Sequence, residues 1–156
     1  MRWYDVKSLA KYITMKCYAD GHPITPAELQ QVLYIVQEAF VLNGSIAFLE
    51  PIIAVNIGPQ VQSIHLMYCS SYGVRRIFPV GYFQNVRDFK FPDQAFVNEV
   101  VDTAIQYDFF TMKNLLCSET EAWHRVWCNE RGVSAVIPLK YIAGAKQPVW
   151  ECIRKK

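Results

Sequence analysis

The segment between residues 25 and 44 has the clearest pattern of apolar and polar positions in the chain. Its apolar residues recur every three or four positions, the spacing that places side chains on one face of an α-helix. One stripe is expected to face the core and holds Leu29, Val32, Leu33, Val36 and Phe40. A second stripe beside it is amphiphilic and holds Gln30, Tyr34, Gln37 and Val41. The pattern therefore predicts a long helix whose second face offers two amides and a phenol.

Both ends of this helix are marked in the sequence. Thr25 is a suitable N-cap, and Glu28 stands three residues later, where it completes a capping box. Pro26 fits the first helical position, because the N–H that proline lacks would have no partner there. Gly44 is a suitable stop, since glycine adopts the left-handed terminal conformation without a steric cost.

The pattern changes after this helix. Residues near 46–57 are too apolar for an exposed loop and contain a proline, so we predict extended chain or a short edge strand packed on the helices. Gly58 and Pro59 then turn the chain into a further helix, predicted over roughly residues 59–71. Its buried side is expected to hold Val61, Ile64, Met67 and Tyr68.

Helical spacing also appears near the amino terminus and after residue 92. Asp5 can cap a first helix that continues to about Ala19, with Gly21 after its end. A strong helix is predicted from about Asp93 to Tyr107. Its apolar face is expected to hold Phe96, Val97, Val100, Val101, Ala104 and Ile105.

The last third of the chain predicts shorter elements. They are a helix from Thr111 to Cys117, a helical stretch with Trp123 and Trp127, and a last short helix after Pro138. The tail from residue 145 is expected either to dock on the body or to fray, and its tryptophan favours docking. Residues 73–91 carry two glycines, a proline and separated aromatics, which indicates an irregular excursion with room for strands at 76–91.

These elements together predict a mainly α fold. We expect residues 1–156 to form a compact single-domain bundle of about six helices with the short extended segments described above. With 52% apolar and 14% aromatic residues, the chain can bury a core without a metal or a disulfide.

Charge and targeting signals narrow the classes of partner. The net charge of +2 does not favour nucleic acid, and the basic residues Arg75, Arg76, Arg87 and Lys90 are better explained as a solvated loop face. No apolar stretch approaches the length of a membrane span, and the amino terminus lacks the apolar core of a signal peptide. Five cysteines without a CxxC pair indicate a reducing compartment, hence the cytoplasm.

The long helix and the segment after it carry a family resemblance. The matching residues are Leu29-Gln30, Leu33-Tyr34, Gln37, Gly44, Phe48, Ile52, Ala54, Gly58-Pro59 and Val61. This combination resembles the signature of the Panacea domain, also called the SocA-like antitoxin domain, which is found in bacteria, prophages and phages. The likeness covers about residues 4–143 and leaves 144–156 as a C-terminal tail.

The chain departs from the family pattern near its carboxyl end. Family members carry a Leu-Thr-His-x-x-x-Pro-Trp run there, to which Leu115-Leu116 and Trp123 correspond. Cys117-Ser118 replaces the Thr-His pair, and Ala122 replaces the proline before the tryptophan. Any role of the family's histidine is therefore not inherited.

The resemblance implies the antitoxin of a toxin–antitoxin pair, which neutralises a cognate toxin, usually encoded by an adjacent gene, through direct stoichiometric binding. Such a protein needs no catalytic group, metal or cofactor. The alternative function is that of a phage or mobile-element accessory protein that binds a host protein. Because family members pair with unrelated toxins, we expect the contact residues outside the signature, within residues 73–91. The candidate aromatic anchors there are Tyr82, Phe83, Phe89 and Phe91, whose alternative role is to close a satellite core.

The amphiphilic stripe also leaves two roles open. Gln30, Tyr34 and Gln37 either bind the backbone of the segment at 48–58 or contact a partner directly. The remaining motif residues are expected to be structural: Gly58 and Pro59 set the backbone conformation, and Trp123 lies in the core with Trp127 at its rim.

Candidate chemistry is sparse. His65 with Cys69 and His124 with Cys128 share an i, i+4 spacing that could supply a zinc tetrahedron, but both cysteines also fit as core residues. No glycine-framed nucleophile or glycine-rich phosphate loop is present. Glu119 and Glu121 have the pattern of solvated carboxylates at the start of a helix. We therefore expect neither an enzyme nor a metal site, and a metal-dependent or nucleic-acid-modifying enzyme stays as the second alternative function.

Overall fold

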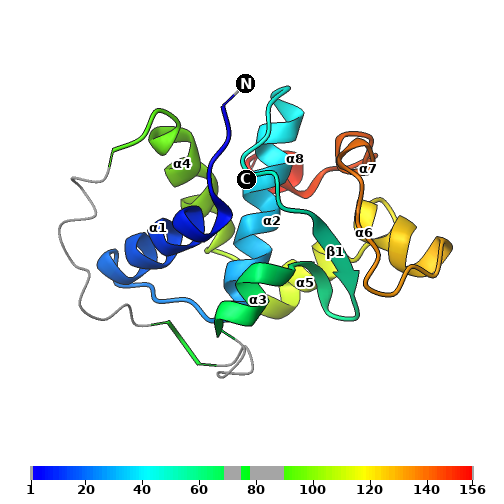
Figure 1. The fold of residues 1–156 in the computed structure, drawn as a ribbon, viewed down its shortest axis with the longest axis horizontal. Helices are drawn as coiled ribbons and strands as arrows, with labels where there is room; N and C mark the ends of the chain where they lie inside the picture. The colour runs from blue at the N-terminus through cyan, green and yellow to red at the C-terminus, as the bar shows by residue number, and fades with distance from the viewer. Residues whose placement is uncertain (1, 69–74, 78–89, 156) are drawn as a thin grey trace.

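The structure, a computed structural model, describes residues 2–68, 75–77 and 90–155. Within these ranges the chain forms eight α-helices, where about six were predicted, together with one π-helical turn and a two-stranded antiparallel sheet (Figure 1). In chain order the elements are α1 (Val6–Ala19), α2 (Pro26–Leu42), β1 (Ile52–Val55), β2 (Gly58–Val61), α3 (Gln62–Tyr68), α4 (Gln94–Ala104), α5 (Phe109–Leu116), α6 (Ala122–His124), η3 (Arg125–Asn129), α7 (Leu139–Ala143) and α8 (Val149–Ile153). The predicted mainly α fold is confirmed.

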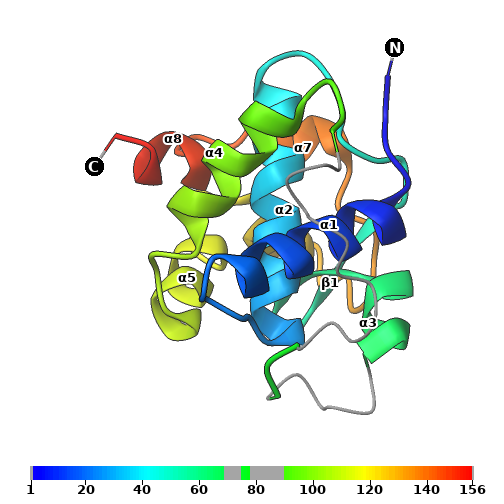
Figure 2. The same ribbon diagram turned by 90° about the vertical axis from the view of Figure 1, so that its left-hand side faces the viewer.

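Helix α2 runs through the centre of the molecule, and the other elements surround it (Figures 1 and 2). Its predicted capping box is confirmed, since Thr25 Oγ1 accepts the Glu28 N–H at 3.1 Å and Glu28 Oε1 accepts the Thr25 N–H at 3.0 Å. Gly44 follows the helix with a left-handed φ of +79°. Because α2 packs against α1, α4, α5, α7, α8 and the sheet, its side chains are buried on nearly every side. Polar residues of α2 consequently need partners inside the molecule.

The outer helices largely follow their predicted spacing. Asp5 caps α1 by accepting the Ser8 N–H at 2.9 Å, and Gly21 follows that helix with φ +77°. Helix α4 begins one residue after Asp93, whose carboxylate does not cap the helix. It accepts instead the hydroxyl of Tyr4 at 2.6 Å, which ties the amino-terminal segment to the start of α4.

A β-hairpin follows α2 and corrects one prediction. The extended segment near 46–57 is confirmed by β1, but the helix expected from residue 59 begins only at Gln62. The register pairs Ile52 with Val61, Ile53 with Gln60, Ala54 with Pro59 and Val55 with Gly58. Extended backbone forms in β2 because its polar groups find partners on two sides, in β1 and in Gln30 of α2. Gly58 has a φ of +130°, a conformation that few other residues adopt without strain.

A third segment extends the hairpin. Ser134 N–H donates to the Ala54 carbonyl and Ile137 N–H donates to the Ile52 carbonyl, each at 2.8 Å. Residues 134–137 thereby join the C-terminal third of the chain to β1. Of the other region in which strands were expected, 76–91, the structure describes only residues 76–77 and 90–91, and these four form no strand.

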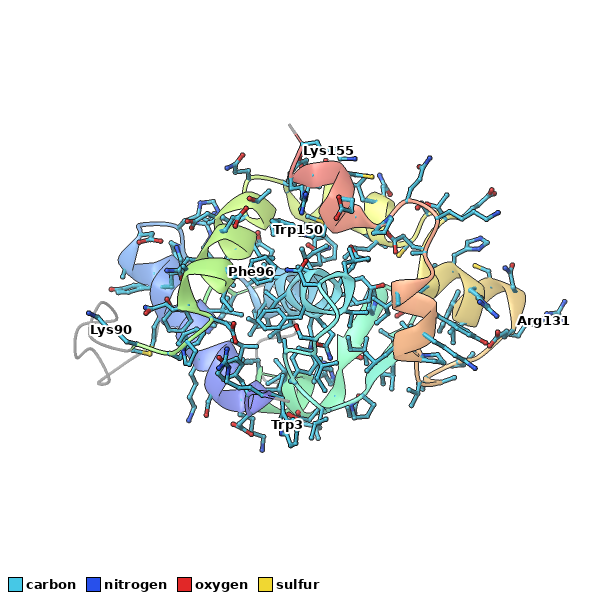
Figure 3. All side chains as sticks on the ribbon, turned by 90° about the horizontal axis from the view of Figure 1, so that it is seen from above. Trp3, Lys90, Phe96, Arg131, Trp150 and Lys155 are labelled. Carbon is cyan, nitrogen blue, oxygen red and sulfur yellow. The ribbon has the colours of Figure 1, made fainter. Side chains whose placement is uncertain are left out.

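The C-terminal tail ends in the short helix α8, which confirms the predicted docking. Trp150 of α8 is 2% exposed, and its ring meets that of Phe96 edge-on at 6.4 Å between centroids (Figure 3). The rings of Trp123 and Trp127 stack with 5.7 Å between their centroids. Trp123 is buried and Trp127 is half-buried, which confirms the predicted core and rim positions. The turn that carries Trp127 is π-helical.

Candidate functional site

Two glutamines of α2 bind the backbone of neighbouring segments. Gln37 is 1% exposed, its Nε2 donates to the Phe48 carbonyl at 2.7 Å, and its Oε1 accepts the Ala47 N–H at 2.7 Å. Gln30 binds the backbone of Val61 in a similar way. Its Nε2 donates to the Val61 carbonyl at 3.0 Å, and its Oε1 accepts the Val61 N–H at 2.8 Å. Of the two roles left open by the sequence, the structure favours backbone binding for both glutamines.

Tyr34 lies on the same stripe and is also inside the molecule. It is 1% exposed, and its hydroxyl has no hydrogen-bond partner among the described residues. Burial, reinforced by the charges of Glu38 and Glu121, holds the pKa of Tyr34 well above its ordinary value. Neither Tyr34 nor Gln37 reaches the surface in this fold, which corrects the expectation that a partner could contact them directly.

Two glutamates meet in the interior beside the start of α8. Glu38 comes from α2 and is 0% exposed, while Glu121 directly precedes α6 and is 2% exposed. Glu38 Oε1 accepts the N–H of Trp150 at 2.7 Å, and Glu121 Oε1 accepts the N–H of Val149 at 2.8 Å. These N–H groups open α8 and have no acceptor within that helix. The carboxyl pair therefore supplies the N-terminal cap that the local sequence of α8 lacks.

The electrostatics of this pair require a shared proton. Burial raises the pKa of Glu38 to about 7, and burial together with the charge of Glu38 raises the pKa of Glu121 to about 9. The two carboxyls accept the N–H groups of adjacent residues, so ionising both would place two negative charges side by side in a buried site. The pair therefore holds a proton near neutral pH. The Oε2 atom of each group is buried and has no hydrogen-bond partner among the described residues.

Sequence reasoning missed this pair. Glu121 was expected to be a solvated carboxylate, which is wrong, whereas its neighbour Glu119 is exposed as expected. A signal for Glu38 does exist, because it stands one turn after Tyr34 in a helix that is apolar on nearly every side. Glu121 has no such signal, since its burial depends on Val149, 28 residues later in the chain.

The proposed aromatic anchors are only partly described. Tyr82, Phe83 and Phe89 lie outside the described residues, so their role stays a prediction. Phe91 is half-buried, and its ring lies 5.3 Å from that of Tyr4 and 4.9 Å from that of Tyr12, both edge-on. Phe91 packs against the main hydrophobic core, so the structure favours a packing role for it over that of an exposed anchor.

The motif residues at the end of the signature serve the hairpin. Pro59 of β2 pairs with Ala54 of β1. Trp123 Nε1 donates to the Val55 carbonyl at 2.8 Å, which ties α6 to β1. Cys117, at a diverged position, lies beside the hairpin, with its Sγ 3.7 Å from where a Cβ would stand on Gly58. Ala122 is 2% exposed, whereas Cys117 is half-buried.

The described residues offer little for metal or small-molecule chemistry. Among them, no three His, Cys, Asp or Glu side chains are placed to hold a metal, and Cys69, one of the four residues whose spacing could supply a zinc site, lies outside the described residues. Burial raises the pKa of Cys17 to about 12 and that of Cys117 to about 11, so both thiols stay protonated. A pocket between α2, α4 and α5 has space for about one water, about 10 Å³. No helix in residues 2–68, 75–77 and 90–155 is long and apolar enough to cross a bilayer.

Three exposed apolar residues lie in the hairpin turn and along the segment that bonds to β1. Ile57 is in the turn between β1 and β2, Val133 directly precedes residues 134–137, and Val136 lies within them, opposite Ile53. Their exposed fractions are 47%, 72% and 52%, respectively. We call these three residues the hairpin patch. Hydrogen bonds of the sheet hold the neighbouring backbone, so these exposed apolar side chains have defined positions.

No family model, curated protein or solved structure matches this chain. Its function has to be inferred from its own residues.

Proposed function

We propose that this protein is an antitoxin-like binding module, which neutralises a cognate toxin in the cytoplasm by stoichiometric contact. The toxin would be encoded by an adjacent gene in a bacterial or prophage genome. The observation that carries the proposal is the Panacea-like combination of residues between Leu29 and Val61. Tight binding alone can block a toxin, so the module requires no cofactor and no catalytic group.

The positions of the signature residues support a scaffold that relatives could share. Those exposed by at most 3% are Leu29, Leu33, Tyr34, Gln37, Phe48, Ile52, Ala54 and Val61. A motif made of interior residues conserves the fold and leaves the surface free to vary. Such an arrangement suits a family whose members bind unrelated toxins.

The location of the titratable groups favours binding over catalysis. Tyr34, Glu38 and Glu121 are the groups with strongly shifted pKa values that come together, and each is at most 2% exposed. Catalytic acids and bases need to reach a substrate. A closed cluster that caps a helix has no such access.

The surface offers a second region for partner contact beside the predicted aromatic anchors. Clustered apolar side chains on a fixed backbone are typical of protein interfaces. The hairpin patch meets this description, with Val133 its most exposed member. We therefore place partner contact at the hairpin patch, at the anchors Tyr82, Phe83 and Phe89, or at both.

Co-expression with each neighbouring open reading frame tests the function. We expect one neighbour to arrest growth when induced alone and to be harmless when this protein is co-expressed and co-purifies with it at a fixed ratio. A control in which Phe48→Asp disrupts the core should not rescue growth. Harmless neighbours combined with co-purification of a host protein would replace the antitoxin proposal by the accessory-protein alternative.

Surface variants then locate the contact. The first variant carries Tyr82→Ala, Phe83→Ala and Phe89→Ala, and the second carries Val133→Ser and Val136→Ser. Phe110→Ser is the matched control, since Phe110 is 74% exposed on α5. We expect the first or the second variant to weaken toxin binding in calorimetry at least tenfold with unchanged melting, and the control to bind normally. Full affinity in both variants would exclude these two surfaces.

A further inference from the structure

Helix α8 is attached to the body by one set of polar contacts that depends on protonation. Its first two N–H groups, of Val149 and Trp150, are accepted by the carboxyls of Glu121 and Glu38 at 2.8 and 2.7 Å. The remaining attachment is apolar: Val149, Trp150 and Ile153 are at most 3% exposed, and the Trp150 ring meets that of Phe96 of α4. Figure 3 shows α8 at the edge of the molecule with Trp150 directed inward toward α2 and α4.

Within the described residues, no positive side chain compensates the carboxyl pair. Among the described residues, neither Glu38 nor Glu121 forms an ion pair, and the charged neighbour that acts on Glu38 from α8 is another acid, Glu151. The neighbour from α2 is the phenol of Tyr34, and α4 contributes the uncharged ring of Phe96. Two carboxylates in such a site would repel each other at close range and in a low dielectric. One proton between them removes that repulsion.

We propose that Glu38 and Glu121 form a proton-operated latch, which keeps α8 docked while the pair holds a proton and releases α8 when both carboxyls are ionised. In the released state Trp150 leaves its site and both carboxyls gain access to water. The latch rests on the contacts of α8 and does not depend on the proposed function.

The direction of the effect follows from proton counting. A water-exposed glutamic acid has its pKa near 4.5, below the docked values of about 7 for Glu38 and about 9 for Glu121. Between pH 7 and 9 the docked pair therefore holds one proton and the released pair holds none. Release gives up that proton, so the opening equilibrium constant should rise about tenfold for each pH unit in this window. Above pH 9 it should level off.

Hydrogen exchange of the full chain measures this opening. We expect the protection factors of the α8 amides, corrected for the intrinsic pH dependence of exchange, to fall about tenfold per unit from pH 7 to 9. Amides in the middle of α2 serve as the internal reference and should keep their protection. Protection of α8 that is constant over this range would overturn the latch. A parallel loss in α2 would also overturn it, because the whole fold rather than α8 would then be opening.

Substitutions test the origin of the pH dependence. Glu121→Gln keeps a carbonyl acceptor for Val149 N–H and places an amide donor where the proton lies, so it should hold α8 docked with no change in protection between pH 7 and 9. The matched control is Glu119→Gln, which removes the same charge two residues away at an exposed position and should behave as the wild type. Alkaline release that persists in Glu121→Gln would contradict the proposal. The wild-type profile decides the matter even if Glu121→Gln does not fold.

Discussion

Two sets of side-chain hydrogen bonds attach other segments to α2, and they use different chemical groups. We call them the amide joint and the carboxyl joint. At the amide joint, Gln37 binds the backbone at residues 47–48 and Gln30 binds Val61. At the carboxyl joint, Glu38 and Glu121 bind the first N–H groups of α8. Both joints use side chains to satisfy backbone groups of a segment that is distant in sequence.

The difference lies in what each group can offer. An amide is donor and acceptor at once, so one glutamine satisfies both an N–H and a carbonyl and does so at any physiological pH. An ionised carboxyl only accepts, and two of them in one buried site need a proton to coexist. The glutamine contacts therefore hold their segment at any physiological pH, whereas the carboxyl contacts hold α8 only while the pair carries a proton.

The largest expected effect is at the carboxyl joint. Trp150→Ala should lower the free energy of unfolding by about 4 kcal/mol, because it removes a large buried aromatic side chain from the contact between α2, α4 and α8. Urea denaturation at pH 6 measures the loss. Trp3→Ala is the control at a 50% exposed position and should change stability by less than about 0.5 kcal/mol. A loss below about 1 kcal/mol for Trp150→Ala would mean that α8 adds little to global stability and opens on its own.

Gln37→Ala should have the next largest effect. It leaves the Ala47 N–H and the Phe48 carbonyl buried without partners, which should cost about 3 kcal/mol. Urea denaturation at pH 6 and at pH 9 should give the same loss, since no titrating group is involved. A loss that changes between these pH values would break the distinction between the two joints.

Gln30→Ala should cost less, about 1–2 kcal/mol. Gln30 also satisfies two backbone groups, but it is only half-buried, so water can replace its amide at Val61. The difference between the Gln37 and Gln30 variants, measured in one urea series, isolates the contribution of burial. Equal losses would show that water does not reach Val61.

The sequence predicts well wherever the determinants are local. Thr25 and Glu28 cap α2 as expected, and Asp5 caps α1, because each contact joins residues three apart. The apolar face of α4 likewise follows from spacing alone. The capped starts of helices are therefore readable from short windows of the chain, whereas α4 ends at Ala104, three residues before the predicted Tyr107.

The failures come from contacts between distant residues. The sequence around Pro59 does not predict a strand, because the extended form of β2 depends on β1 and on Gln30 of α2. Nothing near Glu121 announces burial, because its partner at Val149 belongs to the far end of the chain. The candidate site was found in part for the same reason: Gln30, Tyr34 and Gln37 were visible on one helix, whereas the carboxyl pair spans two elements.

Tyr34→Phe should give the smallest effect and links the two joints, since Tyr34 lies between Gln37 and Gln30 on α2 and interacts with Glu38. Its buried hydroxyl has no partner among the described residues, so its removal should leave stability unchanged or raise it by about 0.5 kcal/mol at pH 6. Thermal melting of Tyr34→Phe beside the wild type provides the measurement. A loss above about 1 kcal/mol would assign the hydroxyl a hydrogen bond to the carboxyl pair. The latch would then comprise three groups, and α2 would contribute two of them.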